Sequence, residues 1–174
     1  LAVNANDVLD YVGRTVTSAA RVQGASEGGD VVLTGELAGD GAVAERFSEA
    51  LNRIKLPPFE LAFDGLGSFG RGRPRALWAG IAPNEALATL SRAHEHAALA
   101  AGLEPEVRNF HPHVTLARMR NTKAAGVATY LAHNGVFVSS PFPVTRFVLY
   151  SARDSRGGGP YVVERAYPLA EPGE

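Results

Sequence analysis

Apolar residues recur at helical spacing in two long segments of the chain. One is 42–54 and the other is 84–101, whose apolar stripe includes Leu87 and Leu90. This spacing places apolar side chains on one face, so both segments are predicted to be helices. Pro57 follows the first segment and Gly102 the second, as expected beyond helix ends.

Other apolar runs are short or alternate with polar residues, which is typical of strands. Strands are predicted at 31–33, 59–63, 75–81, 113–117, 142–151 and 161–169. The last two are expected to form an antiparallel hairpin with a flexible glycine-rich tip. Weaker patterns predict helices at 7–23 and 123–132, and a loose glycine-rich connection at 65–72. This mixture of helices, strands and hairpins predicts an α+β fold.

Composition narrows the possible classes of protein. The 174 residues suit one domain or two small ones, and a net charge of -1 gives no reason to expect a polyanion-binding surface over the whole molecule. Without cysteine, the chain has no disulfide scaffold, thiol catalyst or cysteine-ligated zinc site. No apolar run approaches the ~20 residues that span a bilayer. A cytoplasmic protein is expected, although the chain begins at Leu1 and so suggests a fragment.

The five histidines are confined to the second part of the chain, at 94, 96, 111, 113 and 133, and the first 93 residues contain none. His94 and His96 stand two residues apart on a predicted helix and cannot converge on one metal, so both are predicted to be exposed. His133 is expected at a helix C-terminus. His111 is either a turn residue or a group that orders a substrate.

The segment 108–118, RNFHPHVTLAR, carries the most informative spacing. In a strand, His113 and Thr115 share a face about 7 Å apart, while Val114 and Leu116 are predicted to face the core. An imidazole transfers protons near neutral pH, and a hydroxyl donates a hydrogen bond to a phosphoryl oxygen. Spacing alone also allows an incidental surface pair.

PHVTLAR resembles the second His-x-Thr motif of the 2H phosphoesterases, which include bacterial 2'-5' RNA ligase-like proteins and RNA 2',3'-cyclic phosphodiesterases. PPFELAFDGLGSF, RALWAGIAP, FVLYSA and YVVERAYPLA are also similar to this family and follow its usual order. The resemblance covers roughly 42–170. It implies a bilobal fold of antiparallel sheets with helices packed outside.

The resemblance also implies a reaction and roles for individual residues. The substrate would be an RNA or nucleoside 2',3'-cyclic phosphate, hydrolysed to a 2'-phosphate without a metal or other cofactor. His113 would be the general base, Thr115 would bind the phosphate, and Arg118 would neutralise charge near it. Strict alternation turns Arg118 away from His113, so that role needs a bulge or a strand end.

The first motif of the family, His-x-Thr-Leu followed by Phe-Leu-Gly, is degenerate here. Its best match is VLTGELAG at 32–39, where Thr34 and Gly39 fall in place but Val32 occupies the histidine position. Thr34 is therefore a predicted phosphate-binding residue, whereas valine cannot move a proton. The first lobe is expected to be incomplete or replaced, and any activity to be impaired.

Residues 1–35 resemble a different family, the C-terminal part of a class III nucleotidyl cyclase domain. That family has an Asn and, four residues later, an Arg that hold the ribose and the phosphate. This chain has Thr17 at the Asn position and keeps Arg21, and the metal-binding aspartates are absent. We therefore expect 1–41 to be a cyclase-like segment or a surrogate for the missing part of the first lobe, and 42–174 to be the 2H-like domain.

Four functions are compatible with this sequence. The first is an impaired 2',3'-cyclic phosphodiesterase, and the second is an inactive 2H-like domain that binds RNA ends or nucleotides. A non-functional fusion or fragment is the third, and a cyclase half-domain comes last. Arg71, Arg73 and Arg75 could contact an RNA backbone or lie in a solvated loop. RNA or a nucleotide is thus the expected partner, with no membrane and no stable protein partner.

Overall fold

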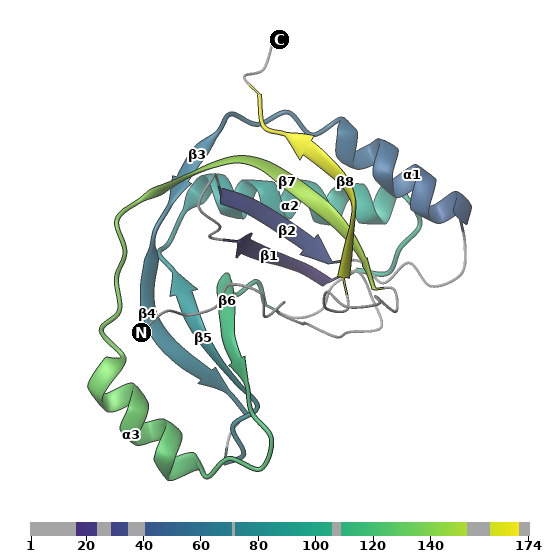
Figure 1. Ribbon diagram of the computed structural model, residues 1–174. Helices are drawn as coiled ribbons and strands as arrows, with labels where there is room; N and C mark the ends of the chain where they lie inside the picture. The colour runs from purple at the N-terminus through teal and green to yellow at the C-terminus, as the bar shows by residue number, and fades with distance from the viewer. Residues whose placement is uncertain are drawn as a thin grey trace.

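The computed structural model describes residues 17–23, 29–34, 41–70, 72–105, 109–152 and 161–170, with two sheets and three helices among them. The larger sheet has five strands (Figure 1). They are β1 (Thr17–Gln23), β2 (Gly29–Thr34), β3 (Phe59–Leu61), β7 (Phe142–Ala152) and β8 (Tyr161–Pro168). The smaller sheet consists of β4 (Phe63–Phe69), β5 (Ala76–Ile81) and β6 (His113–Arg118).

Strand β7 organises the larger sheet. On one side it pairs in parallel with β2, which in turn forms an antiparallel hairpin with β1. On the other side it pairs antiparallel with β3 near its start and with β8 along the rest of its length. Strands β1 and β2 therefore share a sheet with β8, while the division of the chain at residue 41 stays a prediction.

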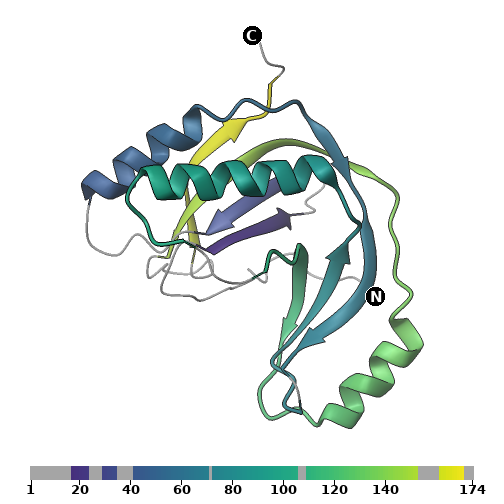
Figure 2. The ribbon, with the colours of Figure 1, turned by 180° about the vertical axis from the view of Figure 1, so that it is seen from behind.

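Two helices cover one face of this sheet. They are α1 (Gly41–Asn52) and α2 (Glu85–Ala100), which lies along the sheet in Figure 2. Asn84 caps α2, because its side-chain oxygen accepts a hydrogen bond from the Leu87 amide at 2.9 Å. Its side-chain nitrogen donates to the Glu60 carbonyl at 2.8 Å, which ties the start of the helix to β3.

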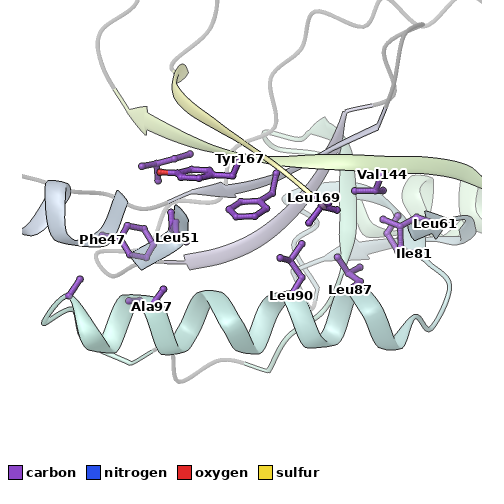
Figure 3. Close-up of a cluster of buried hydrophobic side chains, with 14 residues drawn as sticks. Phe47, Leu51, Leu61, Ile81, Leu87, Leu90, Ala97, Val144, Tyr167 and Leu169 are labelled. Carbon is purple, nitrogen blue, oxygen red and sulfur yellow. The ribbon is translucent and has the colours of Figure 1, made fainter. Parts of the chain in front are cut away.

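The main core lies between these helices and the five-stranded sheet (Figure 3). The helices contribute Phe47, Leu51, Leu87, Leu90 and Ala97, and the strands contribute Leu61, Val144, Phe147 and Tyr167 among others. The rings of Phe147 and Tyr167 stack with centroids 4.9 Å apart. Each fully buried leucine or phenylalanine contributes about 1.5–3 kcal/mol of transfer free energy.

His94 belongs to this core, so the prediction that it is exposed was wrong. It is 2% exposed, and its ring meets Phe147 edge-on at 4.6 Å. The physical reason is helical geometry: position 94 follows Leu87 and Leu90 on the apolar stripe, while His96 faces the other way and is exposed. Burial lowers the pKa of His94 to about 3, so the ring is neutral.

Most predicted elements are confirmed, as is the α+β class. Two of the predicted secondary-structure assignments were wrong. Residues 17–23 of the predicted helix 7–23 form β1, and residues 65–69 of the predicted loop lie in β4. In β4, Gly67 is required because a β-carbon there would lie 2.1 Å from the Trp78 ring. The predicted hairpin of β7 and β8 is confirmed, whereas its tip at 154–160 lies outside the described residues.

The smaller sheet extends away from the main core (Figure 1). Helix α3 (Ala124–Asn134) contacts β4 on this side of the molecule. Val127 is the one buried residue of α3, so this helix buries far fewer apolar side chains than the helices of the main core do. Among the described helices, none is long and apolar enough to cross a bilayer.

Candidate active site

Strand β6 is an edge strand of the smaller sheet and carries the predicted residues His113, Thr115 and Arg118. It pairs antiparallel with β5, which lies between it and β4. On the side of the larger sheet, β1 makes the main contact with β6. The candidate site therefore lies where the edges of the two sheets meet (Figures 1 and 2).

A β-bulge brings all three predicted residues of β6 to one face. Thr115 pairs with Trp78 but Ala117 pairs with Leu77, so Leu116 is an extra residue in β6. Arg118 then pairs with Ala76 of β5. Ala76 and Trp78 stand two residues apart in β5 and so lie on the same face of the sheet, which places Arg118 on the same face as Thr115. The bulge that this role of Arg118 required is present.

The same bulge overturns the prediction for Leu116. This side chain is 42% exposed instead of facing the core, because the extra residue breaks the alternation of the strand. Val114, which precedes the bulge, packs against the main core as predicted.

A hydrogen bond fixes the state of the His113 ring. Its Nδ1 lies 2.6 Å from the carbonyl oxygen of His111. A carbonyl can only accept a hydrogen bond, so in this contact Nδ1 carries the proton. In the neutral ring the other nitrogen, Nε2, then has a lone pair with which it can accept a proton.

Burial shifts His113 further toward the neutral form. Desolvation lowers its pKa below the usual 6.5, and the nearby His111 ring also lowers it, whereas the hydrogen bond to the His111 carbonyl raises it. The net result is a lowered pKa. At neutral pH the ring is therefore mostly unprotonated, which is the state that a general base needs.

Two aromatic side chains and His111 surround His113. The Phe69 ring meets His113 edge-on at 4.8 Å, and Trp78 meets His111 in the same way at 4.8 Å. Phe69 and Trp78 contact each other at 5.5 Å. We did not predict either aromatic residue as part of the site. Trp78 lies in a predicted strand, but Phe69 falls in the segment predicted as a loop, and the register that brings the two rings together is not visible in the sequence.

Thr115 and Arg118 differ in their exposure. Thr115 is 7% exposed, so its hydroxyl is held by the packing around it. Arg118 is exposed at the end of the strand, and partial burial lowers its pKa below the usual 12.5. A fixed hydroxyl and a cation on one strand face are the groups that bind a phosphate.

Of the degenerate first motif at 32–39, the described residues 32–34 lie on β2. Val32 pairs with Val148 of β7, and Thr34 at the end of β2 pairs with Tyr150. In the larger sheet β1 lies beyond β2, and it is β1 that makes the main contact with β6. Val32 and Thr34 are thus in the sheet opposite His113, and the phosphate-binding role of Thr34 stays a prediction.

His133 and His111 differ in their relation to the site. His133 is in the last turn of α3, as predicted, and its Nδ1 lies 2.7 Å from the Thr129 carbonyl within the same helix. His111 is exposed, and its ring lies 5.7 Å from that of His113. It is therefore part of the candidate site and not only a turn residue. The described part of the chain contains no group of three histidine, aspartate or glutamate side chains placed to hold a metal ion.

The proposed cyclase-like segment is only partly described. Residues 1–16 lie outside the described residues, and Thr17 and Arg21 lie on β1. The resemblance of 1–35 to the nucleotidyl cyclases therefore stays a prediction.

Comparison with known proteins yields one family. The sequence model of the 2'-5' RNA ligase superfamily matches residues 32–156, which include both Val32 and His113. An RNA 2',3'-cyclic phosphodiesterase of Aeropyrum pernix is 36% identical over 83 residues, and one of Geobacillus stearothermophilus is 45% identical over 65 residues. These matches cover 47% and 37% of this chain, and 47% and 21% of the relatives' own lengths. The matched region is thus less than half of each relative.

Solved structures share the fold over a longer stretch. The structure of E. coli LigT complexed with 3'-AMP superposes with a TM-score of 0.59 at 25% identity, covering 76% of this chain and 72% of that chain. A structure described as a phosphoesterase gives a TM-score of 0.59 at 26% identity and covers 88% of this chain and 83% of its own.

Proposed function

Because this chain belongs to the 2'-5' RNA ligase superfamily, we propose that it hydrolyses a 2',3'-cyclic phosphate at the end of an RNA or on a nucleoside. The product is a 2'-phosphate with a free 3'-hydroxyl. The proposal extends to this chain the activity named in the curated relatives.

One observation carries the proposal: the hydrogen bond between His113 Nδ1 and the His111 carbonyl leaves Nε2 as a base on the strand face that also holds Thr115. In the proposed step, Nε2 removes a proton from water as the water oxygen attacks phosphorus. The bond from phosphorus to the 3' oxygen breaks, and that oxygen takes up a proton. Thr115 and Arg118 hold the phosphoryl oxygens and offset their charge.

The protonation of the 3' oxygen is the weak step in this chain. The family places a histidine where Val32 stands, and valine has no proton to give. A solvent water would then supply the proton. Losing one proton-transfer group costs typically ~10²–10⁴-fold in rate, so we expect slow turnover.

Turnover of a nucleoside 2',3'-cyclic phosphate by wild type and His113→Ala tests the proposal. We expect the substitution to reduce kcat by at least about 10²-fold, because the general base is lost. His133→Ala is the matched control, since His133 is an exposed histidine of α3 whose ring bonds within its own helix. Equal turnover by His113→Ala and His133→Ala would refute the role of His113.

The pH dependence of kcat/KM provides a second test of His113. His113 acts as a base only when neutral, so kcat/KM should fall as the pH drops through its pKa. Because that pKa is lowered, the midpoint of the fall should lie below 6.5. A midpoint above 6.5 would assign the acid limb to another group.

A catalytically inactive RNA-end or nucleotide-binding domain is the second candidate, and Val32 at the histidine position favours it. In that case wild type binds a 2'-phosphorylated nucleotide without hydrolysing the cyclic form. Binding should weaken in Thr115→Val, which removes the hydroxyl and keeps the shape of the side chain. Absence of both turnover and binding would leave the interpretation as a non-functional fusion or fragment.

A further inference from the structure

Charge is unevenly distributed along the chain. From Leu66 to Asn84 and from Asn109 to Arg153, the sequence contains no acidic residue. These stretches hold most of β4 and all of β5, β6 and α3, and they also hold β7 of the larger sheet. Before α3 begins, these stretches contain five arginines and one lysine, at positions 71, 73, 75, 118, 120 and 123.

Position 71 lies outside the described residues, and the fold gathers the described cations at one end of the smaller sheet. The Arg75 amide donates to the Phe69 carbonyl at 2.8 Å, which closes the turn between β4 and β5. The Met119 amide donates to the Arg75 carbonyl at 2.8 Å, which brings the end of β6 beside that turn. This end of the sheet points away from the five-stranded sheet (Figure 1). We call Arg73, Arg75, Arg120 and Lys123 the basic tip.

All four side chains of the basic tip are exposed. The one acidic residue of the three strands, Asp64, stands at the other end of β4, five residues before Phe69. Five residues of strand span about 16 Å, beyond the Debye length at physiological salt. In contrast, Arg92 of α2 is paired with Glu85 at 2.9 Å. The tip is therefore a local positive field that the rest of its own sheet does not neutralise.

The basic tip continues from the candidate active site. Arg118 belongs to the site face of β6 and pairs with Ala76, the residue directly after Arg75. From Thr115 to Arg120 the chain spans roughly 16 Å if extended. A mononucleotide whose phosphate lies at Thr115 is too short to contact the far side of the tip, whereas an RNA chain can contact both.

We infer that the basic tip binds the phosphate backbone of a single-stranded RNA whose 3' end is held at His113 and Thr115. The inference rests on the proposed function, because it extends the same substrate away from the reacting phosphate. A 2',3'-cyclic phosphate is a 3'-terminal group, so the rest of the RNA leads outward from the site. The preferred substrate is accordingly an oligoribonucleotide.

The test compares wild type with Arg73→Gln/Arg75→Gln/Arg120→Gln. The probe is a 5'-fluorescein-labelled single-stranded oligoribonucleotide ending in a 2'-phosphate, and its binding is followed by fluorescence anisotropy at several salt concentrations. A cation that contacts a phosphate of single-stranded RNA contributes about 0.7 to the slope of log K against log salt. We therefore expect the slope to become about 2 less steep and the affinity at low salt to fall about tenfold.

Arg53→Gln/Lys55→Gln/Arg92→Gln is the matched control. It removes the same charge from exposed positions in and after the helices of the larger sheet. This control should keep the wild-type affinity and salt slope. If both triple variants weaken binding equally, net charge and not the basic tip is responsible, and the inference is overturned. Unchanged binding in the tip variant overturns it as well.

Mononucleotide kinetics and a second polyanion complete the design. The tip variant should hydrolyse a nucleoside 2',3'-cyclic phosphate as wild type does, and an equal loss of that turnover would contradict a role confined to the RNA chain. Binding of polyglutamate as tight as that of the RNA would show a general polyanion surface instead. Anisotropy needs no turnover, so an inactive wild type would refute the proposed function and still leave this inference testable.

Discussion

The two sheets of this molecule differ in how they are packed and in the polar side chains they carry. The five-stranded sheet is covered by α1 and α2 and contains the main core, but its family histidine position is Val32. The three-stranded sheet has a thin layer of packing, and it carries His113, Thr115 and Arg118 on one face. The family fold is kept here, and of the two predicted motif positions only that in the smaller sheet carries a histidine, our proposed proton-transfer group.

Two histidines show the same difference at the level of single side chains. His94 is buried beside Phe147, and neither of its ring nitrogens has a hydrogen-bond partner among the described residues. His113 is half-buried and has a carbonyl partner that fixes its tautomer. The same imidazole is therefore a neutral core residue in one region and a candidate base in the other.

The largest expected effect separates the two regions by stability. Leu90→Ala, at a fully buried position, should lower the free energy of unfolding by about 2–5 kcal/mol, because it removes apolar contacts and leaves a cavity. Leu116→Ala makes the same change on the smaller sheet, at a side chain 42% exposed, and should cost less than about 1 kcal/mol. Urea denaturation measures both. Equal losses would mean that the smaller sheet is packed as tightly as the main core.

The next prediction adds a proton-transfer group to the larger sheet. Val32→His restores the family histidine, and we expect kcat on a nucleoside 2',3'-cyclic phosphate to rise by about 10²-fold, at the low end for a proton-transfer group. Val32→Asn is the control, since it adds a polar side chain that cannot transfer a proton near neutral pH. A rise in both variants, or in neither, would contradict the view that a missing acid limits turnover.

The smallest of these effects concerns pH and stability. The pKa of His94 is about 3 in the folded protein and 6.5 in the unfolded chain, so the unfolded chain binds more protons between these values. Stability should therefore fall as the pH drops below 6.5, by about 2 kcal/mol between pH 7.5 and pH 5. Chemical denaturation should show a clearly smaller fall in His94→Leu than in wild type, because the lowered pKa of His113 leaves a residual loss of stability in acid in both proteins.

His96→Leu provides the comparison for that measurement. His96 lies on the same helix and is exposed, so its removal should leave the fall in stability with pH as it is in wild type. Parallel pH curves for wild type and His94→Leu would show that the buried ring is not the group that loses stability in acid.

Local patterns were sufficient to predict most elements but not their partners. The helices at 42–54 and 84–101 follow from apolar spacing, and the strand that begins at His113 follows from alternation. The glycine-rich segment 65–72 was mispredicted, because its strand depends on pairing with β5 and on the space that Gly67 leaves for Trp78. The prediction for His94 failed because it rested on the spacing to His96, whereas the place of position 94 on the stripe with Leu87 and Leu90 turns the ring into the core.

By itself, the sequence determined the motif around His113, the absence of a histidine at position 32 and the α+β class, since these depend on residue identity and short-range period. Only the tertiary structure decided which side chains share a face. The extra residue Leu116 turns Arg118 toward the face of His113 and Thr115, and the register with β5 and β4 brings Trp78 and Phe69 beside the histidines. Strand register is set by contacts between segments far apart in the chain, and a single sequence does not record it.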